Sequence, residues 1–188
     1  MHQLSRHVVR RSLSAVVAAA LVAGCAEDSP LTPSRQAALP AHAAIVPESA
    51  AEGEALATLQ RVTARYQDLN VALDEDFVLL EGCESRPGEG PAGAVYVHFG
   101  RLLDGVIDPE LPDALIYEPA RNGRSRLVGV EFAIPYALWT QPAPPSFLGA
   151  AFQPEDEFGV WALHAWVWLH NPEGMFAKTN PRVTCGLL

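Results

Sequence analysis

The clearest alternation of hydrophobic and polar residues runs from Trp161 to Pro172. Because successive side chains of a β-strand point to opposite faces of the sheet, a strand here would have two unlike faces. One face would hold only aliphatic side chains: Leu163, Ala165, Val167 and Leu169. The other would alternate imidazole and indole rings: His164, Trp166, Trp168 and His170. The first set is typical of a hydrophobic core, whereas the second is a candidate functional surface.

A second pattern, with a period of three to four residues, precedes the strands. Large hydrophobic residues recur there at helical spacing: Leu56, Leu59, Val62, Tyr66, Leu69 and Leu73. This spacing places them on one side of a helix. We therefore expect an amphipathic helix over Ala50–Leu73, which needs an apolar surface to cover its hydrophobic stripe.

The strongest short-range signal is Asn122-Gly123, which lies between two apolar segments, Ala114–Pro119 and Ser125–Pro135. Both residues tolerate the positive φ angles of a tight hairpin turn, so the sequence predicts two antiparallel strands. A two-residue turn would set these pairs: Leu115 with Val130, Tyr117 with Val128, and Glu118 with Leu127. A further strand is expected over Ala94–Phe99, where alternation separates Tyr96 and His98 from the aliphatic residues.

Together these elements predict an α+β fold in one domain, residues 49–188. We expect a twisted antiparallel sheet with the N-terminal amphipathic helix packed on its apolar face and a polar, aromatic opposite face. The proline-rich segment Trp139–Phe158 is expected to cover part of that opposite face, because long connections often form binding loops. The candidate ligand-binding residues are Tyr96, His98, Glu131, His164, Trp166 and Trp168.

Three interpretations of this polar and aromatic face stay open. In the first, the indoles form a second hydrophobic layer; in the second, they are a platform for a sugar or another small-molecule ligand. In the third, the domain is a metal-dependent enzyme that binds a divalent transition metal, with Glu118 or Tyr96 as acid or base. The metal ligands would be His98, Glu131 and His164. His170 is excluded from this cluster, because six residues of strand place it about 20 Å from His164.

The N-terminus has the pattern of a signal peptide. Arg6, Arg10 and Arg11 form a basic segment, and an apolar run follows and ends in Val22-Ala23-Gly24-Cys25. This ending resembles a bacterial lipobox, which implies that residues 1–24 are removed and that Cys25 is lipidated by palmitate-type acyl chains. The alternative is an ordinary secretory signal. Residues 25–48 are then a flexible tether, and the domain lies in the periplasm or outside the cell, anchored to the cell membrane or outer membrane.

The charge of the chain indicates which classes of partner to expect, and its cysteines indicate whether a disulfide bond forms. The chain has 13 Lys and Arg against 22 Asp and Glu, a formal net charge of −9, and loss of the arginine-rich signal makes it more negative. An acidic surface argues against nucleic acid as a partner. With Cys25 lipidated, Cys83 and Cys185 remain, and in an oxidising compartment we expect them to form a disulfide bond. Two buried free thiols are the alternative.

Several segments resemble a family of uncharacterised secreted bacterial proteins. They are Asp104–Pro109, Ala114–Pro119, Leu127–Phe132 and His164–Phe176, of which the last has the most specific motif, His-x-Trp-x-Trp. The resemblance spans about Leu59–Cys185 and supplies no activity or substrate. It implies a histidine and an acidic residue two and four positions before His164, where this chain has Ala162 and Val160. A metal site of that family would therefore have lost ligands here.

Overall fold

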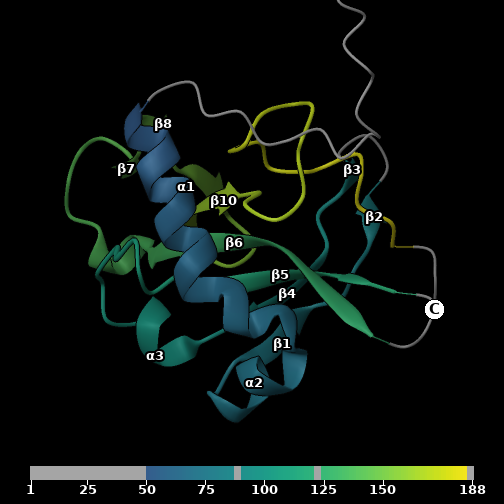
Figure 1. Cartoon of the computed structure of the whole chain (residues 1–188). Helices are drawn as coiled ribbons and strands as arrows, with labels where there is room; N and C mark the ends of the chain where they lie inside the picture. Colours follow the sequence, from purple (N-terminus) through teal and green to yellow (C-terminus); the bar gives the residue numbers. More distant parts are fainter. Residues whose placement is uncertain (1–49, 87–89, 121–123, 186–188) are drawn as a thin grey trace, which may run out of the picture. The chain divides into compact units, whose positions relative to one another are not determined.

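The computed structural model describes residues 50–86, 90–120 and 124–185. These residues fall within one compact unit, Leu39–Leu188. An antiparallel sheet with a few helices makes up this unit, so the predicted α+β class is confirmed (Figure 1). The predicted signal peptide, tether and Asn122-Gly123 turn lie outside the described residues.

The main sheet has six strands in the order β1-β4-β5-β6-β10-β9, and every neighbouring pair is antiparallel. Their bounds are β1 Val78–Glu81, β4 Ala94–Val97, β5 Ala114–Pro119, β6 Ser125–Pro135, β10 Val160–Ala165 and β9 Gln153–Glu155. Two short ladders lie outside it: β2 (Ser85–Arg86) with β3 (Gly90–Pro91), and β7 (Ser146–Phe147) with β8 (Ala150–Ala151). The strands β5 and β6, which lie at its centre, are the two strands that the hairpin pattern predicted.

The predicted continuous helix Ala50–Leu73 is wrong, because the chain forms three shorter elements. These are α1 (Ala50–Thr63), the 3-10 helix η1 (Ala64–Gln67) and α2 (Leu69–Asp74). The break is at Asp68, whose backbone is extended and whose side chain accepts a hydrogen bond from the Asn70 amide. Asp68 therefore caps a new helix, which periodicity alone does not reveal. The other helices are α3 (Phe99–Leu102) and the 3-10 helix η2 (Tyr136–Leu138).

The larger core lies between α1 and one face of the sheet, and we name it the helix-side core (Figure 1). Its members include Leu56, Leu59, Tyr66, Phe77, Leu115, Tyr117, Phe132 and Leu163. Two polar contacts cross it: the Tyr117 hydroxyl donates to the Tyr66 carbonyl at 2.7 Å, and Trp168 Nε1 donates to Thr63 Oγ1 at 3.0 Å. Such bonds satisfy groups whose burial would otherwise cost free energy.

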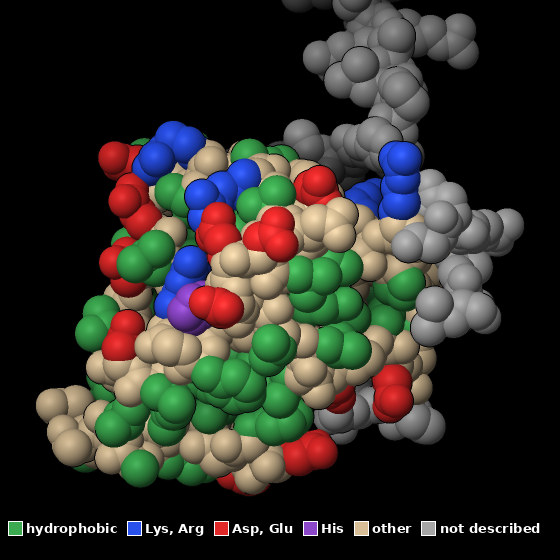
Figure 2. Space-filling view, turned by 90° about the horizontal axis from the view of Figure 1, so that it is seen from below, with side chains coloured by type: hydrophobic (Ala, Val, Ile, Leu, Met, Phe, Trp, Pro, Cys, Tyr) green, Lys and Arg blue, Asp and Glu red, His purple; other side chains and the backbone are tan. Residues whose placement is uncertain are grey.

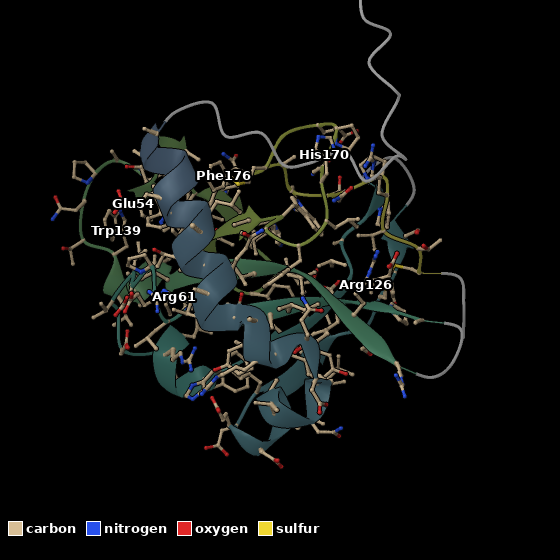
Figure 3. The ribbon with its side chains drawn as sticks, in the orientation of Figure 1. Glu54, Arg61, Arg126, Trp139, His170 and Phe176 are labelled. Carbon is tan, nitrogen blue, oxygen red and sulfur yellow. A yellow bond between two sulfur atoms is a disulfide. The ribbon has the colours of Figure 1, made fainter. Side chains whose placement is uncertain are left out.

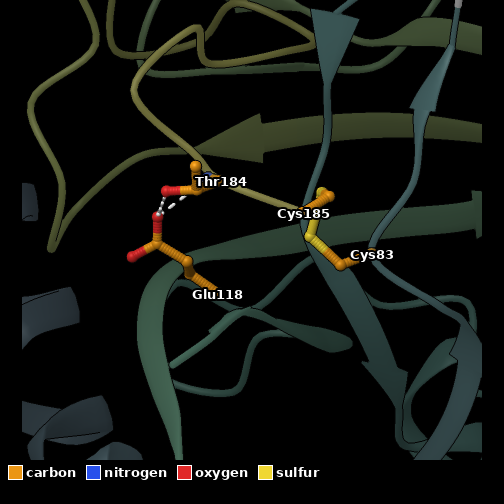
Figure 4. Close-up of a disulfide and its surroundings, with 4 residues drawn as sticks. All are labelled: Cys83, Glu118, Thr184 and Cys185. Carbon is orange, nitrogen blue, oxygen red and sulfur yellow. Dashed lines mark hydrogen bonds between the residues drawn. A yellow bond between two sulfur atoms is a disulfide. The ribbon is translucent and has the colours of Figure 1, made fainter. Parts of the chain in front are cut away.

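A smaller core lies on the other face, under the C-terminal tail, and we name it the tail-side core. It contains Ile116, Val128, Trp166 and Val183. The predicted disulfide is confirmed: Cys83 and Cys185, 102 residues apart in sequence, are bonded beside this core (Figure 4). Next to the disulfide, Glu118 accepts hydrogen bonds at 2.8 Å from both the amide and the hydroxyl of Thr184 (Figure 4). These contacts fix the tail against the sheet.

The hairpin register agrees with the prediction at one end only. Leu115 pairs with Val130, as predicted, but Tyr117 pairs with Leu127 and Glu118 with Arg126. The register shifts between Ile116 and Tyr117, which leaves Val128 as an extra residue on β6. Such a β-bulge bends a strand and increases its twist.

The predicted strand Trp161–Pro172 is also shorter than expected, because β10 ends at Ala165. The chain then turns: the Val167 amide donates to the Ala165 carbonyl, and the amides of Trp168 and Leu169 both donate to the carbonyl of the bulged Val128. Alternation is lost at this turn. Trp166 enters the tail-side core, whereas Trp168 lies against the helix-side core.

Candidate functional site

A groove opens on the sheet face that points away from α1. Its floor is formed mainly by small aliphatic side chains: Val95, Val97, Ala114, Ala133 and Val160. It extends from Leu80 and Glu81 of β1, at one edge of the sheet, to Glu155 of β9, at the other. The enclosed space of the groove that can take a water-sized molecule is about 70 Å³, and the groove is open to solvent on one side. A concave, mostly apolar surface with a few polar groups is typical of small-molecule binding sites.

The central polar groups of the groove are Glu131 and His164. They are directly paired on β6 and β10, and Glu131 Oε2 lies 3.3 Å from His164 Nε2. Their side chains are only 13% and 10% exposed. Burial by itself lowers the pKa of His164, but the charge and hydrogen bond of Glu131, together with the charge of Glu155, raise that pKa above its ordinary value. The pair therefore favours imidazolium beside carboxylate.

A third titratable group, Asp113, lines the same groove and is 1% exposed. Its carboxyl Oδ2 accepts a hydrogen bond from the Ala133 amide at 2.9 Å. Burial raises the pKa of Asp113 to about 7; the Ala133 amide opposes this rise, and the negative charges of Asp104 and Glu131 add to it. Asp113 thus changes its charge near neutral pH. A buried carboxyl with a strongly shifted pKa in a cleft is a physical indicator of a functional site.

A second ion pair lies at the β9 end of the groove. Lys178 Nζ lies 3.0 Å from Glu155 Oε2, and the two side chains are 43% and 16% exposed. Both residues line the groove. Because Lys178 is partly solvated, this contact contributes little to stability and acts chiefly to place charge at the rim.

The structure does not bring all the predicted ligand-binding residues together. Tyr96 and His98 lie on the helix side, because the Tyr96 ring contacts Tyr117 and the His98 ring contacts Phe77, with centroids 5.3 and 5.4 Å apart. His98 also caps α3, since its Nδ1 accepts a hydrogen bond from the Arg101 amide at 3.1 Å. These two residues are therefore separated from the groove by the sheet itself.

The predicted metal set of His98, Glu131 and His164 does not converge for the same reason. Within the ranges 50–86, 90–120 and 124–185, no group of three or more His, Cys, Asp or Glu side chains is arranged to hold a metal ion. Glu118, the predicted acid or base, binds Thr184 and forms an ion pair with Arg126 at 2.6 Å. Its role in the structure is to hold the C-terminal tail.

The two tryptophans also have separate positions. Trp166 is fully buried beside His164, with ring centroids 6.3 Å apart, and its Nε1 donates to the Ala177 carbonyl at 2.7 Å. Trp168 contacts the helix-side core. Neither lines the groove. Trp166 therefore supports the His164 ring from behind and does not present an open platform to a ligand.

The segment Trp139–Phe158 is not a cover over the groove. Phe147 packs on Phe132, with ring centroids 4.9 Å apart, and Phe152 is buried in the helix-side core. Only its last part, with Glu155 and Phe158, reaches the groove. Figure 3 shows Trp139, at the start of the segment, on the opposite side of the view from His170 and Arg126.

A patch of exposed hydrophobic side chains borders the groove at the β1 edge. Leu73, Val78, Leu79 and Leu80 are 47%, 45%, 55% and 42% exposed. Hydrophobic side chains gather on the face of the domain formed by α2, β1 and α3, with acidic side chains near them (Figure 2). Leu80 belongs to both the patch and the groove lining, so the groove opens toward an apolar edge.

Sequence reasoning missed five charged groove residues: Glu81, Glu84, Asp113, Glu155 and Lys178. Asp113 directly precedes an apolar strand and follows Pro112, and this position was the only available signal. Glu155 and Lys178 come from irregular segments far apart in sequence, and no periodic pattern connects them. The groove could be recognised only after the strand order was known.

We predict that Glu131→Gln lowers the pKa of His164, because the substitution removes the carboxylate charge that raises it. A group whose pKa is raised in the folded state stabilises the fold most at low pH. This contribution should fall as pH rises through the folded pKa, and it should be smaller in the variant. An NMR titration of the imidazole signals measures the shift. An unchanged His164 pKa in Glu131→Gln would show that the two side chains do not interact in solution.

Within the described residues, no helix is long and apolar enough to cross a membrane. Searches of protein-family models, of characterised proteins and of solved structures found no match to the chain. The resemblance of His164–Phe176 to secreted bacterial proteins therefore stays a prediction. What the chain does has to be argued from the groove itself.

Proposed function

We propose that the domain is a non-catalytic binding protein that takes a small organic ligand into the groove. The observation that carries this proposal is the presence of Asp113, Glu131 and His164 in a groove whose floor is otherwise aliphatic. A groove of this kind excludes water from an apolar ligand and orients it through a few polar contacts. The buried Glu131–His164 pair also costs solvation free energy, which a purely structural face would avoid by using apolar residues.

The sequence predicted a polar, aromatic sheet face opposite the helix, and this proposal changes that description. The ligand-binding face is the one away from α1, and its polar groups are carboxyl and imidazole groups without exposed indoles. A metal-dependent enzyme is the weaker alternative, because His164 and Glu131 supply two ligands of different strands and His98 faces away. A sugar platform is weakened by the burial of Trp166.

We further propose that the protein is a lipid-anchored envelope protein. The support is the lipobox-like Val22–Cys25, the proline-containing stretch after it, and the disulfide Cys83–Cys185, which is typical of oxidising compartments. The groove would then face the periplasm or the cell exterior at the end of a flexible tether.

A Cys25→Ser variant tests the anchor. We expect it to be released into the soluble envelope fraction, because the acyl chains that hold the protein on the membrane have no attachment site. Membrane fractionation followed by immunoblotting measures the distribution. If Cys25→Ser stays in the membrane fraction to the same extent as the wild type, the anchor is not at Cys25.

A panel of small molecules tests the binding function. We expect at least one of n-hexylamine, hexanoate, 1-hexanol or glucose to raise the melting temperature, because a ligand that binds only the folded state stabilises it. Glu131→Gln should reduce that shift. Glu118→Gln is the matched control, because the Glu118 and Glu131 side chains are 12% and 13% exposed, both are ion-paired, and Glu118 lies outside the groove. Equal shifts in both variants would place binding elsewhere.

A further inference from the structure

We propose that the ligand is an organic cation, an amine with a short apolar tail, whose ammonium group is held by the carboxyl groups of Asp113 and Glu131. This inference rests on the proposed binding function and specifies the chemical class of the ligand. It follows from three features of the groove: its charge, the burial of its two central carboxyl groups, and the apolar floor between them and the β1 edge.

The charge of the groove favours a cation. Five carboxyl side chains line it, Glu81, Glu84, Asp113, Glu131 and Glu155, against one lysine and one histidine. Lys178 is paired with Glu155, and His164 with Glu131. The excess of carboxyl groups attracts positive ligands and disfavours anions.

Asp113 and Glu131 have the environment that an ammonium group requires. Asp113 is 1% exposed, and the Glu131 side chain is 13% exposed. The two residues also adjoin in the backbone, since the Asp113 amide donates to the Glu131 carbonyl at 3.0 Å. Two buried carboxyl groups repel each other, and a cation bound between them removes that repulsion. Charge-assisted hydrogen bonds from an ammonium group would replace the water that burial excludes.

The floor of the groove suits the rest of such a ligand. Val95, Val97 and Ala133 present aliphatic surface beside the two carboxyl groups, and Leu80 continues this surface toward the β1 edge. An alkyl tail placed there removes apolar surface from water, so binding should tighten as the tail lengthens. The polar and apolar parts of one amine thus match two adjacent parts of the groove.

The proposal includes a pH dependence with a defined sign. Asp113 faces the negative groups Asp104 and Glu131 and the positive Arg101, and Glu131 is itself paired with His164. Because burial raises the pKa of Asp113 to about 7, its carboxyl is largely protonated at pH 6 and largely ionised at pH 8. A cation binds the ionised form. Amine affinity should therefore rise between pH 6 and pH 8, and binding should release protons.

The test compares three probes of equal length, n-hexylamine, 1-hexanol and hexanoate, by NMR titration of the wild-type protein. We expect hexylamine to bind about tenfold or more tightly than hexanol, because only the ammonium group forms charge-assisted hydrogen bonds with the two carboxyl groups. Asp113→Asn and Glu131→Gln should each remove most of this preference, and Glu118→Gln should retain it. Thermal unfolding of each variant confirms that it is folded before titration.

The outcomes separate the two proposals. If hexanol or hexanoate binds in the groove as tightly as hexylamine, the proposal that the ligand is a cation is wrong, and the proposed binding function stands. If hexylamine binds equally well to wild type, Asp113→Asn and Glu131→Gln, these carboxyl groups do not hold it. If none of the three probes shifts a groove signal and the wider panel also fails, the binding function itself is wrong.

Discussion

Replacing Trp166 with alanine is expected to lower the free energy of unfolding by about 3–5 kcal/mol, the range for large aromatic side chains in protein cores. Trp166 is fully buried and packs with Ile116, Val128 and Val183 in the tail-side core. Its indole N–H also donates to the Ala177 carbonyl, so the substitution leaves that carbonyl without its partner. Urea unfolding followed by circular dichroism measures the loss.

Trp168→Ala is the comparison for this experiment. Trp168 is only partly buried, and its indole bonds the Thr63 hydroxyl, so we expect a smaller loss than at Trp166. If Trp166→Ala instead left stability within about 1 kcal/mol of wild type and abolished ligand binding, the indole would be a binding platform and not core. Equal losses at both positions would contradict the difference in burial between the two rings.

The second large effect is expected from Cys83→Ser/Cys185→Ser. The disulfide joins residues 102 positions apart, and closing so long a loop in the unfolded chain gives about 4–5 kcal/mol in the chain-entropy model. We expect the double variant to lose about 2–5 kcal/mol, the usual range for native disulfides. Changing both cysteines avoids a free thiol that could form mixed disulfides.

Wild-type protein measured with and without reductant is the control for the serine substitutions. Both reduced wild type and the double variant should unfold at similar urea concentrations, because they lack the same constraint. Glu118 and its hydrogen bonds to Thr184 should retain part of the tail contact. A loss below about 1 kcal/mol would show that the tail is held without the disulfide.

Local patterns predicted the parts of the fold that depend on neighbouring residues. Alternation correctly placed Leu163 and Ala165 in one core, and the hairpin pattern correctly paired Leu115 with Val130. The disulfide was expected because two cysteines remain if Cys25 is lipidated and the compartment is oxidising. The strand faces follow from alternation, the hairpin from its turn residues, and the disulfide from the expected compartment. None of these inferences requires knowledge of the complete sheet.

The errors arose where long-range contacts override the local pattern. The carbonyl of the bulged Val128 receives the amides of Trp168 and Leu169, so the chain turns and alternation ends at Ala165. No local feature of Trp161–Pro172 reveals this turn. The break at Asp68 has a local cause instead: its side chain accepts a hydrogen bond from the Asn70 amide and caps a new helix within an otherwise continuous helical pattern.

The three predicted metal ligands do not come together, for a related reason. Alternation shows which residues of one strand share a face, but it does not show how the faces of two strands match. The register of β4 with β5 pairs Tyr96 with Leu115, which belongs to the helix-side core. Tyr96 and His98 therefore face away from His164. Of the six predicted ligand-binding residues, only Glu131 and His164 line the groove, and Asp113 lines it with them.

Methyl-resolved NMR of the protein with n-hexylamine is the most direct test of the claim that this groove is the binding site. Val95, Val97 and Ala133 line the groove, so their methyl signals report on binding there. Leu115 and Leu163 lie in the helix-side core, and their methyl signals serve as the comparison. We predict saturable shifts of the groove methyls with little change in the helix-side ones. Shifts confined to the exposed β1 residues Val78 and Leu79, or absent from the groove at saturation, would contradict it.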